Sequence, residues 1–281
     1  MPIEPSQLQQ HLELAASAYG FDLPLPAGKA LPRAIAPPGE VRVAAPTPVV
    51  SVSPAPAAAS PAAAPVPAPT TPGAPTAPTA PKGPATPEQV ADLQALRAEV
   101  MPCTRCKLHQ GRQHVVFGEG NPSARVLFVG EAPGAVEDQT GRPFVGPAGQ
   151  LLDRILAGAM GLQRSDVYIA NINKCRPPGN RVPEPDEVAA CLPFLRRQIE
   201  IVRPEVIVCL GRTAVQNLLG TTEPMRTLRG RALSYAGVPV VVTWHPAYLL
   251  RDPSHKRETW EDIKRVNRLL GLPERPAPPA S

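Results

Sequence analysis

The architecture of this chain follows from four short apolar runs, the first of which is Arg125-Val126-Leu127-Phe128-Val129-Gly130. The other three are Val167-Tyr168-Ile169-Ala170-Asn171, Val206-Ile207-Val208-Cys209-Leu210-Gly211 and Val238-Pro239-Val240-Val241-Val242-Thr243. Continuous apolar runs are typical of parallel strands that are buried on both faces of a sheet. Helical patterns lie between and after them at residues 149–160, 185–202, 212–219 and 258–270. This alternation predicts a three-layer α/β/α sandwich around a central, mainly parallel sheet of four strands.

The first 88 residues differ in composition from the rest of the chain. They hold 21 of the 40 prolines, mixed with Ala, Thr and Ser. Such a segment buries too little apolar surface to offset the entropy of ordering it. We therefore expect a long disordered Pro/Ala-rich linker at residues 22–88, partly in polyproline II. The pattern of residues 1–21 is compatible with a short amphipathic helix and, at least as well, with a frayed tail. The folded domain is expected at residues 89–272, with a disordered tail at 273–281.

Charge divides at the same boundary. The first 88 residues carry four of the 29 Lys and Arg and five of the 24 Asp and Glu, which leaves 25 against 19, a net +6, for residues 89–281. A basic domain weakly favours a polyanionic partner such as DNA. Because the chain has neither a run of eighteen apolar residues nor a signal-peptide pattern, we expect a cytoplasmic protein without membrane contact. If its partner is DNA, it would be associated with the nucleoid.

Cysteine spacing indicates a metal site, because disulfides are rare in a reducing cytosol. The spacing is Cys103-x2-Cys106, then Cys175 after 68 further residues and Cys191 after another 15. Four thiolates are the ligand set of a tetrahedral zinc ion or a four-iron cluster, and spacing alone leaves both open. His109 and His114 lie near the first pair and could compete as ligands. Cys209, inside the third apolar run, is expected to be a buried core thiol.

Ligands of an open parallel sheet bind at the carboxyl ends of its strands. The first run is followed by Glu131 and a rigid Gly/Pro-rich loop, on which Phe144 could stack on a base, although a lone Phe is more often a core anchor. Asn171 offers a donor and an acceptor that match a pyrimidine edge, with a plain turn residue as the alternative. His245, restricted by Pro246, could aim its imidazole at a ligand oxygen, or be purely structural.

Basic and apolar side chains near these positions are candidates for DNA contact. Basic residues beside the third cysteine could bind phosphates, and leucines after the histidine turn could wedge into a base stack. Solvated surface charge and ordinary core packing are the alternatives. The residues are Lys174, Arg176, Arg181, Leu249, Leu250 and Arg251.

Taken together, these segments resemble the iron–sulfur uracil-DNA glycosylases, the type 4 family of the uracil-DNA glycosylase superfamily. The resemblance covers residues 95–270 and rests on four motifs in family order. These are the Gly130-Glu131-Ala132-Pro133-Gly134 loop, Pro143-Phe144-Val145-Gly146, Asn171-x2-Lys-Cys-Arg-Pro-Pro-Gly-Asn180 and Trp244-His245-Pro246. The resemblance implies a monofunctional DNA repair glycosylase. Such an enzyme flips uracil out of single- or double-stranded DNA and hydrolyses its N-glycosidic bond, leaving an abasic site for base excision repair.

The resemblance also implies roles for individual residues. Phe144 would stack on the flipped uracil, Asn171 would pair with its edge, and His245 would donate a hydrogen bond to uracil O2. A rigid wall from Gly134 to Glu137 would exclude the methyl group of thymine. A [4Fe-4S] cluster would be held by Cys103, Cys106, Cys175 and Cys191.

One position departs from the best-known branch of the superfamily. Where that branch has an aspartate that positions the nucleophilic water, this chain has Ala132. Glu131 is the expected replacement, with Asn180 as its hydrogen-bonded partner and Glu137 in reserve. An oxocarbenium-like sugar needs only a weak nucleophile, so positioning of the water could suffice.

Two other functions are alternatives to a hydrolytic glycosylase. One superfamily branch links itself to DNA through a histidine on a basic insertion, but residues 174–181 contain no histidine. The second alternative is a non-catalytic iron–sulfur DNA-binding or polymerase-recruited protein, whose N-terminal segment docks replication or repair proteins. Phe144, Asn171 and His245 argue for a working enzyme, and we expect it to be a monomer.

Overall fold

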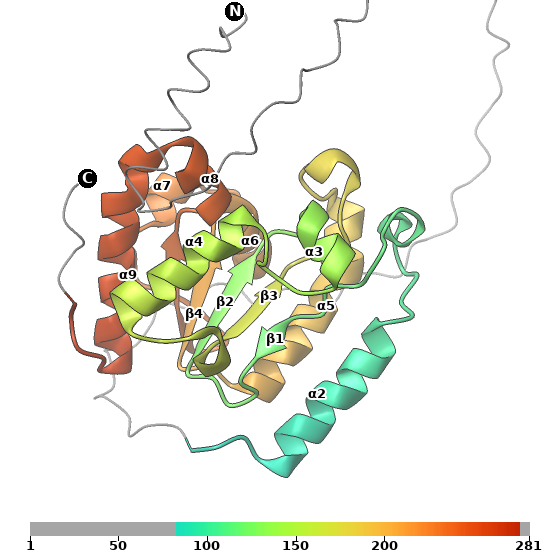
Figure 1. Ribbon diagram of the computed structural model, residues 1–281, viewed down its shortest axis with the longest axis horizontal. Helices are drawn as coiled ribbons and strands as arrows, with labels where there is room; N and C mark the ends of the chain where they lie inside the picture. The colour runs from blue at the N-terminus through green and yellow to red at the C-terminus, as the bar shows by residue number, and fades with distance from the viewer. Residues whose placement is uncertain (1–82, 276–281) are drawn as a thin grey trace, which may run out of the picture. The chain divides into compact units, whose positions relative to one another are not determined.

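Six strands form one sheet in the order β1-β3-β2-β4-β6-β5 in the computed structural model, which describes residues 83–275 (Figure 1). The four predicted strands are confirmed and pair in parallel: β2 (Val126–Gly130), β3 (Tyr168–Asn171), β4 (Val206–Leu210) and β6 (Val238–Thr243). The predicted helix at 1–21, and nearly all of the predicted linker, lie outside the described residues.

The predicted strand number was wrong, because two edge strands were missed. β1 (Glu119–Gly120) and β5 (Leu233–Tyr235) pair antiparallel with β3 and β6 and make the sheet mixed. With two and three residues, they are too short to show an alternating or continuous apolar pattern. Short edge strands are common because they limit pairing with other chains.

Helices flank the sheet on both faces. Leu127 and Val129 of β2 pack in a core cluster with α2 (Pro87–Val100), α5 (Pro185–Val202), α6 (Arg212–Leu219) and α7 (Met225–Leu228). Val126 and Phe128 point to the other face. There they pack with α4 (Pro147–Ile155), the π-helical turn η2 (Leu156–Met160) and α9 (Lys256–Leu270). Figure 1 shows α4 crossing in front of the strands.

Helix ends follow local sequence signals. α2 begins at Pro87, and Thr86 and Gln89 exchange hydrogen bonds in a capping box. α9 ends where Gly271 adopts a left-handed conformation, with φ of 64°. None of the helices in residues 83–275 is long and apolar enough to cross a bilayer.

The strand register brings several loops to one edge of the sheet. Gly130 of β2 lies beside Asn171 of β3, and Leu210 of β4 lies beside Thr243 of β6. Because these strands are parallel, the segments that follow them leave from the same edge. They lead into α3 (Ala135–Thr140) after β2, η4 (Pro178–Asn180) after β3, and α8 (Pro246–Arg251) and η5 (Pro253–His255) after β6. Two further short helices precede strands instead: η1 (Lys107–Gln110) comes before β1, and η3 (Arg164–Asp166) comes before β3.

Candidate functional site

Three of the predicted binding residues meet at the carboxyl ends of the strands. A Cβ atom on Gly130 would lie 2.4 Å from Asn171 Oδ1 and 2.5 Å from Phe144 Cζ, so both side chains use the space that glycine leaves open. The ring centroid of Phe144 lies 5.6 Å from that of His245. We call Gly130, Phe144, Asn171 and His245 the strand-end site.

Phe144 has a backbone conformation that is unusual for a residue with a side chain. Its φ of 52° lies in the left-handed region, which costs a non-glycine residue about 1–3 kcal/mol. Its carbonyl oxygen passes so close to Gly149 that a Cβ atom there would lie 1.8 Å away. The ring is buried and also packs in the core cluster of α4 and α9. Phe144 is therefore a core anchor and, at the same time, a wall of the strand-end site.

Asn171 presents a buried amide oxygen that has no partner among residues 83–275. Its Oδ1 accepts no hydrogen bond within the part of the chain that the structure describes. An unpaired buried acceptor costs roughly 1–3 kcal/mol, which makes such an atom a candidate contact for a ligand. The main-chain oxygen of Asn171 is paired, because Lys174 Nζ donates to it at 2.9 Å.

His245 is a neutral residue whose tautomer is set by its own helix. The Ala247 N–H donates to His245 Nδ1 at 3.1 Å, so the ring proton lies on Nε2. Burial lowers the pKa of His245 to about 4, with a further contribution from the positive charge of Arg251. Gly211 makes room for this residue, since a Cβ atom there would lie 3.0 Å from His245 Cβ. At neutral pH the side chain can donate one hydrogen bond without carrying a charge.

Glu137 ties two loops together. Its Oε2 accepts from the N–H of Gly134 at 3.1 Å, and its Oε1 accepts from Val145 at 3.0 Å and Gly146 at 2.8 Å. The carboxylate is buried between the loop after β2 and the segment that carries Phe144. With these three bonds made, Glu137 has little capacity left to orient a water molecule.

Within the described part of the chain, Glu131 is a carboxylate near the strand ends that stays free. It is half-buried, and its side chain forms no hydrogen bond or ion pair with the described residues. Its main-chain oxygen accepts from Asn173 at 3.0 Å. Asn180, expected to pair with Glu131, is exposed and accepts instead from Arg176 Nε at 2.7 Å.

Two predicted DNA contacts are wrong, because the residues are buried. Lys174 is 1% exposed, and its Nζ donates to Asn171 O and to Gln198 Oε1 at 2.6 Å. Burial also lowers its pKa to about 8. Leu249 is likewise 1% exposed and belongs to the interior face of α8, whereas the adjacent Leu250 is 46% exposed. Neither buried side chain can reach a DNA strand.

The remaining basic candidates reach the surface. Arg251 is exposed at the end of α8. Arg176 is half-buried, and Arg181 forms ion pairs with Glu187 at 2.6 Å and Glu184 at 3.2 Å. Any phosphate that binds Arg181 has to compete with these two carboxylates.

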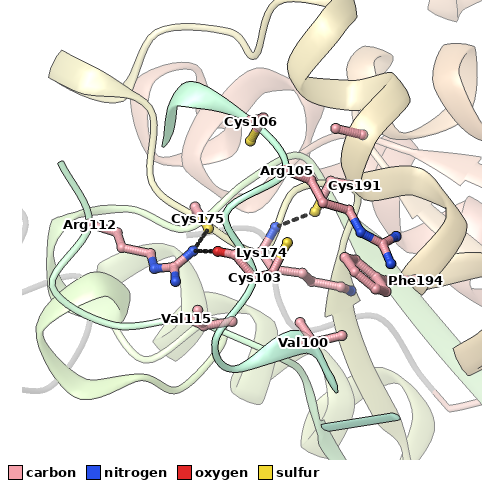
Figure 2. A pocket seen from close by; sticks show the side chains of 11 residues that line it. Val100, Cys103, Arg105, Cys106, Arg112, Val115, Lys174, Cys175, Cys191 and Phe194 are labelled. Atoms are coloured by element: carbon pink, nitrogen blue, oxygen red, sulfur yellow. Dashed lines mark hydrogen bonds between the residues drawn. The ribbon is translucent and has the colours of Figure 1, made fainter. Parts of the chain in front are cut away.

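The four predicted ligand cysteines line one cavity, which we call the cysteine cavity (Figure 2). Cys103 and Cys106 come from the segment after α2, Cys175 from the segment after β3, and Cys191 from α5. Among residues 83–275, no three His, Cys, Asp or Glu side chains are grouped closely enough to hold a single metal ion. The cavity that the cysteines share is otherwise lined mainly by apolar side chains, those of Val100, Val115, Ala190 and Phe194.

Nitrogen donors face two of the sulfurs. The N–H of Lys174 donates to Cys191 Sγ at 3.2 Å, and Arg112 Nη1 donates to Cys175 Sγ at 3.2 Å (Figure 2). Burial raises the pKa of Cys175, Cys106 and, to about 11, Cys191. The thiols would lose their protons on binding a metal centre, and N–H donors at sulfur then stabilise the thiolates.

The other candidate ligands lie outside the cysteine cavity. His109 Nδ1 donates to the Cys106 carbonyl at 2.8 Å, and His114 Nδ1 donates to the Asp138 carbonyl at 2.8 Å. Cys209 is fully buried in β4, where burial raises its pKa. Its assignment as a core thiol is confirmed.

Three polar residues that support the two sites were missed at the sequence level. Arg112 donates to the carbonyl of Cys103 at 2.7 Å as well as to Cys175 Sγ. Gln198 accepts a hydrogen bond from Lys174 Nζ. Arg164 contacts the backbone of Phe144. No local pattern marks these side chains, because their partners lie 9 to 63 residues away along the chain.

Comparison with known proteins gives consistent matches. Residues 117–264 match the family model described as "Uracil DNA glycosylase superfamily". A type-4 uracil-DNA glycosylase of Thermotoga maritima is 47% identical over 63% of this chain and 94% of its own length. Type-4 uracil-DNA glycosylases of Sulfurisphaera tokodaii and Saccharolobus solfataricus are 42% and 43% identical, over 65% and 64% of this chain and 87% of each relative.

Proposed function

The chain belongs to the type-4 family of the uracil DNA glycosylase superfamily and is a uracil-DNA glycosylase of base excision repair, and from this premise we propose how its residues act. Uracil flipped from single- or double-stranded DNA enters the strand-end site. Phe144 stacks on the base, and Asn171 pairs with its edge. The observation that carries this proposal is the buried Asn171 Oδ1, an acceptor that has no partner among the described residues and that the N–H of a base would satisfy.

His245 stabilises the transition state of bond cleavage. When the N-glycosidic bond breaks, the sugar becomes oxocarbenium-like and negative charge develops on the departing uracil. The Nε2–H of His245 donates to uracil O2, and this hydrogen bond strengthens as the charge grows. Loss of such a donor typically costs about 3 kcal/mol of barrier, or about a hundredfold in rate.

Glu131 orients the attacking water. Its free, half-buried carboxylate at the end of β2 supports this role. Asn180 would hydrogen-bond with Glu131 only after giving up the hydrogen bond that it accepts from Arg176 Nε. The wall from Gly134 to Glu137, held together by the Glu137 carboxylate, is proposed to exclude the methyl group of thymine.

The cysteine cavity is proposed to hold a [4Fe-4S] cluster. The ligands are Cys103, Cys106, Cys175 and Cys191, supported by the shared cavity and by the N–H donors at Cys175 and Cys191. When bound, the cluster supplies a covalent link between three chain segments. Iron and sulfide in equal amounts, with a visible charge-transfer spectrum, are expected in the purified protein, whereas stoichiometric zinc would refute the cluster.

The DNA surface lies around the strand-end site. Arg176 and Arg181 contact phosphates, and Leu250 with Arg251 enters the space that the flipped base leaves. Because flipping costs less from a mismatch, uracil opposite guanine is excised faster than uracil opposite adenine.

The domain at residues 89–272 acts as a monomer on nucleoid DNA in the cytoplasm, and residues 1–88 recruit replication or repair proteins.

An excision assay tests this function directly. The holoprotein is incubated with a single-stranded oligonucleotide that contains one uracil, and alkali-labile abasic sites are counted. The same oligonucleotide with thymine serves as the control. Cleavage at uracil alone is expected. A protein with its full metal content that yields no abasic site would instead favour the non-catalytic DNA-binding alternative.

A further inference from the structure

Arg164 is a charged residue that no motif of the sequence includes. It begins the short helix η3 (Arg164–Asp166), 20 residues after Phe144. Its Nη1 donates to Phe144 O at 2.9 Å, and its Nη2 donates to Pro143 O at 2.5 Å. The same guanidinium forms ion pairs with Glu119 at 2.6 Å and Asp153 at 2.9 Å. All three of its nitrogens are engaged.

The bonds from Arg164 fall where the backbone of Phe144 is strained. The peptide that joins Phe144 to Val145 is bonded at both ends, its oxygen by Arg164 and its N–H by Glu137 at 3.0 Å. A cation on the oxygen and a carboxylate on the N–H oppose rotation of this peptide. Because the left-handed φ of 52° is intrinsically unfavourable for Phe144, outside contacts must maintain it.

The two carboxylates hold the guanidinium itself in place. Glu119 accepts from both Nε and Nη2 of Arg164, and Asp153 accepts from Nη1. Glu119 is part of the edge strand β1, and Asp153 is part of α4. Arg164 thus ties the loop of Phe144 to two regular elements, which a single exposed ion pair could not do.

We propose that Arg164 is a positioning residue for base recognition, which holds the Phe144 peptide so that the ring is ready to stack on the flipped uracil. The proposal rests on the stacking role given to Phe144 above. A preformed stack saves the cost of ordering the loop when the base enters. Arg164 itself touches neither uracil nor DNA.

Arg164→Lys is the principal test. Lysine keeps the charge but has a single nitrogen, so it cannot hold two carbonyls and two carboxylates in the same geometry. We expect the single-turnover excision rate to fall about tenfold and inhibition by free uracil to weaken about tenfold, since 1.4 kcal/mol corresponds to one factor of ten. Affinity for uracil-free DNA of the same length is expected to stay within about twofold of wild type.

Arg125 offers a matched control. It is 23% exposed against 21% for Arg164, pairs with Glu205 at 2.7 Å, and donates to the Leu270 carbonyl at 2.7 Å. It precedes β2 at the opposite end of the strand from Gly130. Arg125→Lys should lower the free energy of unfolding by about as much as Arg164→Lys does. It should leave both the excision rate and the inhibition by free uracil unchanged.

The outcomes separate a positioning role from a structural one. Unchanged excision and uracil inhibition in Arg164→Lys would overturn the proposal. An equal loss of excision in Arg125→Lys would overturn it as well, because general destabilisation would then explain both. If Arg164→Lys does not fold, Glu119→Gln weakens the same clamp and should show a smaller loss with the same split between uracil and DNA binding. Should Phe144→Leu leave uracil inhibition unchanged while wild type excises uracil, the stacking role fails and the activity stands.

Discussion

The cysteine cavity and the strand-end site share the chain segment 171–175, since Asn171 belongs to one and Cys175 to the other, but the two sites are built in opposite ways. In the cysteine cavity, buried sulfurs accept hydrogen bonds from Lys174 and Arg112. In the strand-end site, Asn171 Oδ1 has no partner among the described residues and Phe144 is strained. Satisfied contacts stabilise a fold, whereas unsatisfied and strained groups cost stability and are kept where a ligand needs them. We infer that the cavity provides stability and the strand-end site provides chemistry.

Removal of a ligand cysteine should have the largest effect. Cys191→Ser is expected to lose iron and to lower the free energy of unfolding by about 3 kcal/mol or more, on the order of 10 °C in Tm, because metal binding contributes folding energy. Metal analysis and thermal unfolding measure this. Cys209→Ala is the matched control, since Cys209 lies in β4 outside the cavity, and it should keep its iron. Full iron content in Cys191→Ser would contradict the division between the two sites.

Removal of the histidine should affect chemistry rather than stability. His245→Ala is expected to reduce the single-turnover excision rate about a hundredfold, because it deletes the donor that we propose for uracil O2. DNA affinity should stay within a few fold, and Tm should fall by only a few degrees, because the change also removes the hydrogen bond that His245 accepts from the Ala247 N–H. If binding or folding collapses together with the rate, His245 is structural and the contrast between the sites fails.

Lys174 connects the two sites and offers a test of their independence. Its N–H donates to Cys191 Sγ and its Nζ donates to the main-chain oxygen of Asn171. Lys174→Met keeps the length of the side chain and the N–H but removes the Nζ bonds, so excision should fall about tenfold, corresponding to loss of roughly 1.5 kcal/mol from a charged hydrogen bond. Iron content should remain complete. Excision equal to wild type would show that the Asn171 backbone needs no such support.

The smallest expected effect is a shift in pH dependence. The pKa of folded His245, about 4, lies below that of an unfolded histidine. The neutral ring therefore contributes stability in full above the unfolded pKa, and this contribution is lost as the pH falls toward 4. Arg251→Gln removes a cation that depresses this pKa, so the acidic limb of the excision rate should move to higher pH. Rates are measured with saturating enzyme, and an unmoved limb would exclude Arg251 as a cause.

Much of this arrangement could be predicted from local patterns. The four central strands are continuous apolar runs, and Phe144, Asn171 and His245 follow strand ends in family order. The edge strands β1 and β5 could not be predicted, because two or three residues carry no periodicity. The burial of Lys174 could not be predicted either, because a basic residue beside Cys175, with Arg176 and Arg181 nearby, indicates a phosphate contact. Only the packing of α5 puts Gln198 over its ammonium group.

The sequence by itself determined the family, the alternation of strands and helices, the four cysteines that line one cavity and the residues at the strand ends. These features depend on residue type and on spacing along the chain, and both are visible in the sequence alone. The tertiary structure decided which charges are buried, which carboxylate is free and what holds Phe144. Arg164 meets Phe144, Glu137 meets Gly146 and Lys174 meets Gln198 only when separate elements pack. The environment of a polar group is set by these through-space neighbours, and one-dimensional spacing does not record them.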